Sequence, residues 1–300
     1  MLAADLPRWF VWAVSFAWGA AWGSFFNVAI YRWPRGMSVV TPKSHCPGCE
    51  TPIAAWHNIP ILGWLLLRGR ASCCGARISP RYPLVELLAA VLSLTIAELW
   101  IVRAGPGATL FDASLEWMLY FIFAGGLLII TFVDLEWMEI PDEVSLPCAA
   151  LGLLSAPFRA QPGVWSAAVG AGAAYLLVQV IFVWGYERLT GRRGMGEGDS
   201  KLLMMIGAFL GWRGAAFAIV AGAFQGLLYA GFSLLFGHQV TPEIEERIID
   251  GELIEGSSAE EAAHVGQIKV PFGPFLALGA LEYLLAGHRI MSWYLDLMPH

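Results

Sequence analysis

Two aspartates stand where long apolar segments of the sequence meet polar ones. Asp134 follows the apolar run 119–133, and Asp199 follows a Gly-x-Gly sequence and leads into the next apolar segment. If their helices are neighbours, the two carboxyl groups can share one proton, because like charges about 3 Å apart cannot both be ionised. The ionised group then activates water while the protonated group polarises a peptide carbonyl. The sequence therefore predicts that Asp134 and Asp199 form a catalytic pair that hydrolyses peptides.

Each aspartate also has other interpretations. Asp134 can be an interfacial anchor at a helix end, and the two together can form a proton relay in an ion-coupled transporter. The segment from Gly194 to Asp199 can be a flexible loop. It can also be a phosphate-binding turn, although no strand precedes it and the Walker lysine spacing is absent. In the catalytic interpretation, Gly196 and Gly198 allow the backbone to approach a substrate closely.

The cysteines indicate a second kind of chemistry. The chain has five: Cys46, Cys49, Cys73, Cys74 and Cys148. Four of them lie in one polar loop, which favours a metal site or free thiols over disulfides. Cys46-Pro-Gly-Cys49 has the spacing of one half of a zinc site. We predict structural Zn²⁺ held by Cys46, Cys49 and Cys74, with Cys73 or His45 as the fourth ligand. The alternative is a loop whose metal site is degenerating.

The elements that must position these residues are membrane helices. Of the 300 residues, 57% are hydrophobic and only 14% are charged, whereas a soluble domain has about 25% charged residues. Apolar runs of about 18 residues or more can cross a bilayer core as helices. The first run is long for a signal peptide, so we expect a retained helix. We predict an all-α, polytopic helical integral membrane protein with about eight spans: 9–31, 84–102, 115–133, 144–158, 164–186, 200–212, 214–236 and 272–288.

Basic residues predict the orientation and the domains. Of the 18 Lys and Arg residues, 13 lie in the loops of one side, and the positive-inside rule places that side in the cytosol. Both aspartates then lie at the cytosolic edge. We predict a first membrane helix in 1–31, a cytosolic cysteine-containing loop subdomain in 32–83 and a membrane-embedded peptidase domain in 84–300. An acidic cytosolic insert occupies 237–271. We expect contact with membrane lipid and none with nucleic acid.

A series of short sequences resembles the prepilin peptidases, and the resemblance runs in order over nearly the whole chain. The matching segments are Gly23-Ser-Phe-Phe-Asn27, Ser44-His-Cys46-Pro-Gly-Cys49, Asn58-Ile-Pro60, Arg68-Gly-Arg70, Ile78-Ser-Pro-Arg81-Tyr82-Pro83-Leu-Val-Glu86, Asp134 with Ile140-Pro141-Asp142, Gly196-Glu-Gly198-Asp199 and Pro271-Phe-Gly273-Pro274. One such match would be weak, whereas so many in order are highly specific. The segment 237–269 is the least matched part.

The resemblance implies a function. Prepilin peptidases are bacterial inner-membrane enzymes of type IV pilus and type II secretion systems, and they resemble other Gly-x-Gly-Asp intramembrane aspartyl proteases. They remove a basic leader from prepilins and pseudopilins on the cytosolic side. Many then methylate the new N-terminal amine with S-adenosylmethionine. Asp134 and Asp199 match the catalytic positions, whereas Asp142 matches a position that is often Asn in relatives, so we expect it not to be catalytic.

The resemblance also bears on the residues around the aspartates and on the cysteines. It implies that Gly196 and Gly198, together with the turn formed by Pro271, Gly273 and Pro274, shape the site. The family's third cysteine falls on Ala71 of this chain, and Cys73 directly precedes Cys74. The family links this loop to methylation, so we expect the displaced cysteine to affect methylation more than cleavage.

Acidic residues beside Asp134 agree with a basic leader. They are Glu136, Glu139, Asp142 and Glu143. A rim of carboxylates attracts Lys and Arg and raises their local concentration; alternatively, these residues only keep a loop hydrated. Three rival functions are a peptidase without methylation, the transporter, and a non-catalytic scaffold of a secretion apparatus.

Overall fold

The computed structural model describes residues 2–236 apart from 43, 47, 106, 160 and 192–194, the strand residues 248–249 and 252–253, and residues 271–296. Its α-helices are α1 (Arg8–Arg32), α2 (Leu62–Leu66), α3 (Arg81–Ala97), α4 (Leu110–Trp137), α5 (Asp142–Ser155), α6 (Val164–Leu177), α7 (Tyr186–Thr190), α8 (Glu197–Phe236) and α9 (Gly273–Asp296). The 3₁₀ and π segments are η1 (Ala3–Asp5), η2 (Trp33–Arg35), η3 (Ala55–Asn58), η4 (Glu98–Val102), η5 (Ala156–Phe158) and η6 (Val178–Gly185). The two strands β1 (Ile248–Ile249) and β2 (Glu252–Leu253) form one short antiparallel pair. The predicted all-α class is confirmed.

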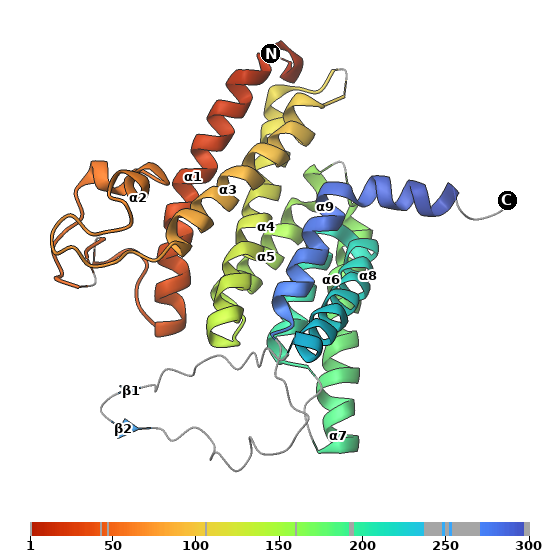
Figure 1. Ribbon diagram of the computed structural model, residues 1–300. Coiled ribbons are helices and arrows are strands. Elements are labelled where there is room, and N and C mark those ends of the chain that lie inside the picture. Colours follow the sequence, from red (N-terminus) through yellow and green to blue (C-terminus); the bar gives the residue numbers. More distant parts are fainter. Residues whose placement is uncertain are drawn as a thin grey trace.

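Helix α4 is the centre of the bundle (Figure 1). Helices α1 and α3 pack on one side of it, and α9 packs against both α4 and α8. Its middle turns are fully enclosed, with Phe123, Leu127 and Ile130 at 0% exposure. Phe123 stacks on Phe209 of α8 with ring centroids 4.6 Å apart. Because α4 carries Asp134 at its end, this packing fixes where that carboxyl lies.

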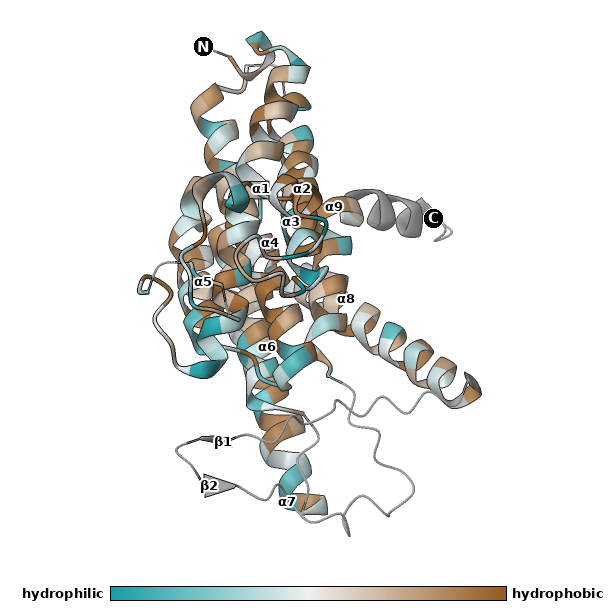
Figure 2. Ribbon diagram, turned by 60° about the vertical axis from the view of Figure 1, so that its left-hand side comes forward, coloured by the Kyte–Doolittle hydropathy of each residue, from teal (hydrophilic) through white to brown (hydrophobic). Residues whose placement is uncertain are grey.

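The outer surface of the bundle is that of a membrane protein. Five helical stretches are long and apolar enough to cross a membrane: Arg8–Arg35, Arg81–Val102, Leu110–Trp137, Val164–Thr190 and Glu197–Ser233. Hydrophobic residues predominate along these helices, and hydrophilic ones gather in the turns and loops (Figure 2). Large side chains such as Leu154 and Trp165 are 74% and 81% exposed. Apolar surface this extensive is buried by lipid in a membrane protein, so the predicted multi-pass membrane class is confirmed.

The predicted number of eight crossings is not confirmed. The expected span 144–158 corresponds to α5, which has 14 residues, and the apolar part of α9 covers only Gly273–Gly287. The expected spans 200–212 and 214–236 are the two halves of α8, which is interrupted at Gly211. Short helices of this kind are tolerated in a membrane where they are covered by protein or line a cavity.

The interruption of α8 has a visible cause. Gly211 adopts φ 71°, a left-handed conformation that breaks the helix and that glycine adopts without steric cost. The break leaves carbonyl groups without helical partners. The buried guanidinium of Arg159 donates to two of them, Ala208 O at 2.9 Å and Phe209 O at 2.7 Å, and to Gly152 O of α5 at 2.7 Å. One arginine thus holds the ends of two short helices together.

Two predicted segments lie largely or partly outside the described residues. Most of the acidic insert 237–271 is in this category, apart from β1, β2 and Pro271. The glycine-rich segment before Asp199 is described from Met195 onward.

Candidate active site and cysteine cluster

Asp134 lies in the last turns of α4 and is buried, with 6% exposure. The helix ends three residues later, where Met138 adopts a left-handed φ of 52° and donates its N–H to the Asp134 carbonyl. The carboxyl Oδ2 accepts a hydrogen bond of 3.0 Å from the backbone N–H of Gly273. A Cβ at Gly273 would lie 2.6 Å from the same oxygen. The absence of a side chain at this position therefore lets the start of α9 lie directly on the Asp134 carboxyl.

Asp199 lies in the first turn of α8 and is also buried, with 8% exposure. Its Oδ2 accepts the backbone N–H of Gly196 at 3.1 Å. Its position at a helix N-terminus places the carboxyl where the unpaired N–H groups and the helix dipole are positive. The neighbouring Ser200 hydroxyl donates to the Glu197 carbonyl at 2.6 Å, which fixes this first turn.

Ile140 connects the two aspartates. A Cβ at Gly198 would lie 2.9 Å from Ile140 Cβ, and one at Gly273 would lie 3.4 Å from Ile140 Cδ1. Ile140 thus contacts both the turn that carries Asp199 and the turn that holds Asp134. The end of α4 and the start of α9 lie at the lower end of the bundle in Figure 1. Because Ile140 contacts the turns at both aspartates, the structure brings the predicted pair to one place.

The other predicted residues take clear positions. Pro274 follows Gly273 in the first turn of α9, where proline is favoured because its missing N–H would have no helical partner. Pro271 lies two residues before Gly273. Sequence reasoning missed the role of Ile140, although the residue belongs to one of the segments that carry the resemblance. The only sign of this role in the neighbouring sequence is that the apolar Ile140 stands between the acidic Glu139 and Pro141.

Two of the four acidic residues near Asp134 are neutralised by basic side chains. Lys201 Nζ lies 2.7 Å from both carboxylate oxygens of Asp142, so the first turns of α5 and α8 are linked. Arg81, at the start of α3, pairs with Glu136. Glu139 and Glu143 are exposed and have no ion pair with any basic residue that the structure describes. These two are therefore the carboxylates that can act on a ligand.

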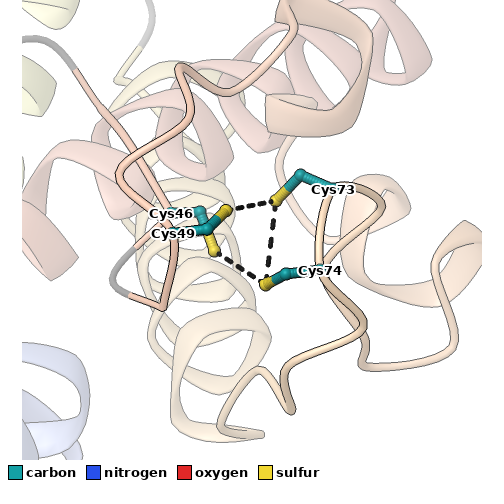
Figure 3. Close-up of side chains that lie close together, drawn as sticks. All are labelled: Cys46, Cys49, Cys73 and Cys74. Carbon is teal, nitrogen blue, oxygen red and sulfur yellow. Dashed lines mark hydrogen bonds between the residues drawn. The ribbon is translucent and has the colours of Figure 1, made fainter.

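The four loop cysteines converge (Figure 3). Their sulfur atoms all lie within 4.8 Å of one another. The pairs Cys49–Cys73, Cys46–Cys74 and Cys73–Cys74 are 3.2, 3.6 and 3.9 Å apart, which is far longer than a disulfide bond of about 2.05 Å. In a tetrahedral zinc site with Zn–S bonds of about 2.3 Å, the sulfur atoms are about 3.8 Å apart. The donor set and its spacing therefore fit a Zn²⁺ ion.

The displaced cysteine fits because of a tight turn. Ala71 N–H donates to Ala76 O, Gly75 N–H donates to Ala71 O, and Gly75 has φ 71°. This turn directs the adjacent Cys73 and Cys74 side chains toward Cys46 and Cys49. The described group of possible ligands consists of these four cysteines, and His45 is not part of it.

The protonation of the thiols also favours a cation. The Thr51 hydroxyl, 3.3 Å from Cys49 Sγ, lowers the pKa of the Cys49 thiol to about 6. Cys49 in turn raises the pKa of the neighbouring Cys73 thiol to about 12. Without a cation, the four groups cannot all be thiolates at neutral pH. A divalent metal removes this obstacle because coordination deprotonates a thiol.

The fold and the site together define a class: a polytopic helical membrane protein with a pair of buried aspartates at one end and a four-cysteine loop beside the bundle. Comparison with known families gives the identity of that class. Residues 17–100 match the family model described as the bacterial peptidase A24 N-terminal domain. Residues 121–231 match the model of the type IV leader peptidase family. The chain belongs to the type IV leader peptidase family.

Curated relatives agree over most of the chain. A protein of Aeromonas hydrophila named prepilin leader peptidase/N-methyltransferase is 35% identical over 98% of this chain and 97% of its own length. Proteins with the same name from Klebsiella pneumoniae and Stutzerimonas stutzeri are 39% and 32% identical. They cover 70% and 91% of this chain, and the matches span 90% of the length of each relative. No solved structure matches the chain significantly.

Proposed function

We propose that the chain removes the basic leader from type IV prepilins and pseudopilins and then methylates the new N-terminal amine. Membership of the leader peptidase family and the names of the relatives support both activities. The observation that carries the mechanism is the pair of buried carboxyls, Asp134 and Asp199, each fixed by a backbone N–H. Two ionisable groups would not be buried at the ends of two helices for packing alone, because burying a charge is costly.

Asp134 and Asp199 act as a general acid/base pair. In each carboxyl, Oδ2 accepts the N–H of a glycine, while Oδ1 has no hydrogen-bond partner among the described residues. The ionised carboxylate takes a proton from water, and the oxygen of that water attacks the peptide carbonyl carbon. The protonated carboxyl donates a hydrogen bond to the carbonyl oxygen, where negative charge develops. A proton is then transferred to the leaving nitrogen, and the carbon–nitrogen bond breaks.

Gly196, Gly198 and Gly273 place backbone directly next to the carboxyls. A Cβ at any of them would meet Ile140 or an aspartate carboxyl, so the missing side chains let these turns lie against the pair. An extended substrate segment can approach backbone groups of this kind closely.

Replacing Gly273 with alanine will lower kcat for leader cleavage by about a hundredfold. The added Cβ would lie 2.6 Å from Asp134 Oδ2, so the carboxyl must move and lose its hydrogen bond, and misplacement of a catalytic group by about 1 Å costs about 10²-fold. Steady-state cleavage of a prepilin in detergent or nanodiscs measures this change. The control is Gly172→Ala, because a Cβ there meets open space. Equal rates in the two variants would exclude a contact between Gly273 and a working carboxyl.

Glu139 and Glu143 attract the leader, because the other two acidic residues already have partners. Changing both to glutamine will raise KM for a Lys-rich leader about fivefold at low salt and leave kcat within twofold. The difference will vanish near 0.5 M salt, where exposed charges are screened. A substrate whose leader Lys residues are replaced by Gln is the matched control. Its KM should be the same for the double variant and for the unmodified chain. A salt-independent rise in KM would contradict an electrostatic role.

Methylation uses S-adenosylmethionine as the methyl donor. The amine nitrogen attacks the donor methyl carbon, the carbon–sulfur bond breaks, and the amine loses a proton. Cys46, Cys49, Cys73 and Cys74 would hold Zn²⁺ as a closed, structural site, since all four positions of a tetrahedral ion are then filled by protein. The metal would fix the loop, and it would take no part in the reaction.

The enzyme acts at the bacterial inner membrane with its site facing the cytosol. This orientation follows from the basic loops. Arg81 and Lys201, both paired near the aspartates, belong to this basic side.

Mass spectrometry of a prepilin incubated with the purified, reconstituted chain and S-adenosylmethionine tests the proposal. We expect loss of the leader mass and a gain of one methyl group, about 14 Da, on the mature chain. Leader loss without the gain would leave a peptidase alone. No leader loss would favour the rivals: a transporter predicts proton-coupled flux that depends on Asp134 and Asp199, and a scaffold predicts neither activity.

A further inference from the structure

We propose that α2 and the arginines that follow it form a binding site for the phosphate group of a membrane phospholipid. The site comprises the apolar face Leu62, Leu65 and Leu66 and an adjacent hollow lined by Arg68, Arg70 and Arg77. It would hold the cysteine loop on the surface of the bilayer. The site is argued from its own observations and does not rest on the proposed function.

The first observation is the apolar face of α2. Leu62, Leu65 and Leu66 are 55%, 56% and 75% exposed. Residues three and four positions apart share one side of a helix, so these leucines form a single patch. Gly63 is buried and Trp64 is half-buried, and they face away from it. In water such a patch would be unfavourable, and the neighbouring bilayer can cover it.

The second observation is the depth of α2. The backbone N–H of Ile61, directly before α2, donates to Glu86 Oε2 at 2.6 Å. Glu86 is five residues past the start of the membrane-spanning α3, which is about 8 Å along the helix axis. Interfacial helices lie at this depth, between the lipid headgroups and the acyl chains. Figure 1 shows α2 beside α1 and α3, along their length and not beyond their ends.

The third observation is the hollow next to α2. It has a volume of about 490 Å³, and its lining includes Trp64, Arg68, Arg70 and Arg77. The side chains of these three arginines have no hydrogen bond or ion pair with another residue that the structure describes. Three like charges around one hollow repel each other unless an anion lies between them.

The wall of this hollow is held in place. The Trp64 indole N–H donates to Ile78 O at 3.1 Å, and Gly69, with φ 70°, lies against the ring, where a Cβ would be 3.0 Å away. Arg68 itself has φ 50°, an uncommon conformation for a residue with a side chain. Strained backbone of this kind is often found at ligand sites.

Charge and shape identify the ligand. A phosphate diester carries the negative charge that three arginines recognise, and its acyl chains would lie along the leucines. S-adenosylmethionine fits less well, because its sulfonium and ammonium groups outnumber its single carboxylate and the arginines would repel it. A free inorganic anion would fill the hollow and leave the apolar face uncovered. The observations together favour a phospholipid of the cytosolic leaflet, such as phosphatidylglycerol.

Native mass spectrometry of the full chain, released from nanodiscs that contain phosphatidylglycerol, tests the site. The variant R68Q/R70Q/R77Q should retain bound phosphatidylglycerol about tenfold less than the unmodified chain. The control R8Q/R103Q/R213Q removes the same charge from the opposite end of the bundle and should change retention less than twofold. Leader cleavage within twofold of the unmodified chain shows that a variant is folded. Equal retention in the two triple variants would overturn the proposal, and so would displacement of the lipid by 20 mM inorganic phosphate.

Photocrosslinking tests the depth of α2 separately. Benzoylphenylalanine in place of Leu66 should crosslink to phospholipid in membranes, whereas the same group in place of the exposed Glu50 should not. Crosslinks from position 66 to a second copy of the chain would show instead that the patch is a protein interface. That result would reject the lipid site.

Discussion

Replacing either Asp134 or Asp199 with asparagine will lower the rate of leader cleavage by about 10³- to 10⁴-fold, the contribution expected of a general acid/base group. Asparagine has the shape of aspartate, and its oxygen can still accept the N–H of Gly273 or Gly196. The packing at the ends of α4 and α8 is therefore retained. The amide can neither take a proton from water nor exchange one with its partner, so only the chemistry is lost.

Quantitative cleavage assays on reconstituted variants measure this effect, and methylation supplies the internal control. A synthetic peptide that begins at the mature N-terminus needs no cleavage, so both variants should methylate it at the normal rate. Asp142→Asn is the matched substitution, since Asp142 is half-exposed and bound to Lys201. An exposed ion pair is worth about 1 kcal/mol or less, so this variant should stay within tenfold of the unmodified rate. Normal cleavage by either Asp134→Asn or Asp199→Asn would reject the carboxyl pair.

The sequence predicts the membrane helices well because their signal is local. Long apolar runs such as 115–133 must form helices in a bilayer, where every backbone group needs an internal partner. The division of α8 was predicted near residue 213, and the break lies at Gly211. The stabilising contact comes from Arg159, about 50 residues away in the chain. No local pattern reveals such a contact, so the position of the break can be estimated but its cause cannot.

In the site, too, some features can be predicted from the neighbouring sequence, whereas others depend on contacts between distant segments. Asp134 and Asp199 can be selected from the sequence because an ionisable residue at the end of an apolar run is rare and costly. The N–H that holds Asp134 comes from Gly273, 139 residues further along the chain. That contact depends on the packing of α9 against α4. The spacing of residues within either segment does not predict how the two helices pack. Ile140 was missed for the same reason, since its role arises only where three turns meet.

The cysteine loop shows how a spacing rule can mislead. Cys73 and Cys74 depart from the usual Cys-x-x-Cys pattern, which predicts an impaired metal site. The rule assumes that ligands must be separated by a turn of fixed length. Here the turn between Ala71 and Ala76, with Gly75 in a left-handed conformation, lets adjacent residues reach the same point. The geometry of the loop therefore agrees with the predicted Zn²⁺ site and gives no support to the alternative of a degenerating one.

Replacing Cys46 or Cys74 with serine will remove the metal and reduce methylation at least tenfold, while cleavage stays within twofold. Loss of one ligand of a structural zinc site opens the tetrahedral shell, and because metal binding and folding of a small metal-held loop are coupled, the loop loses its fixed shape. The aspartates are held by α4, α8 and α9, none of which includes a cysteine of the cluster. Elemental analysis should give about one zinc per chain before the substitution and below about 0.2 after it.

Cys148→Ser is the control for this experiment, because Cys148 lies in α5 and outside the cluster. It should retain both the zinc and the two activities. A chain purified without metal that still methylates would show that four converging thiols suffice to hold the loop. If the cysteine variants instead lost cleavage and methylation equally, the loop would support the whole enzyme. The ion pair between Arg81 and Glu136 would then be the first connection to examine, because it joins the end of the cysteine loop to the helix that carries Asp134.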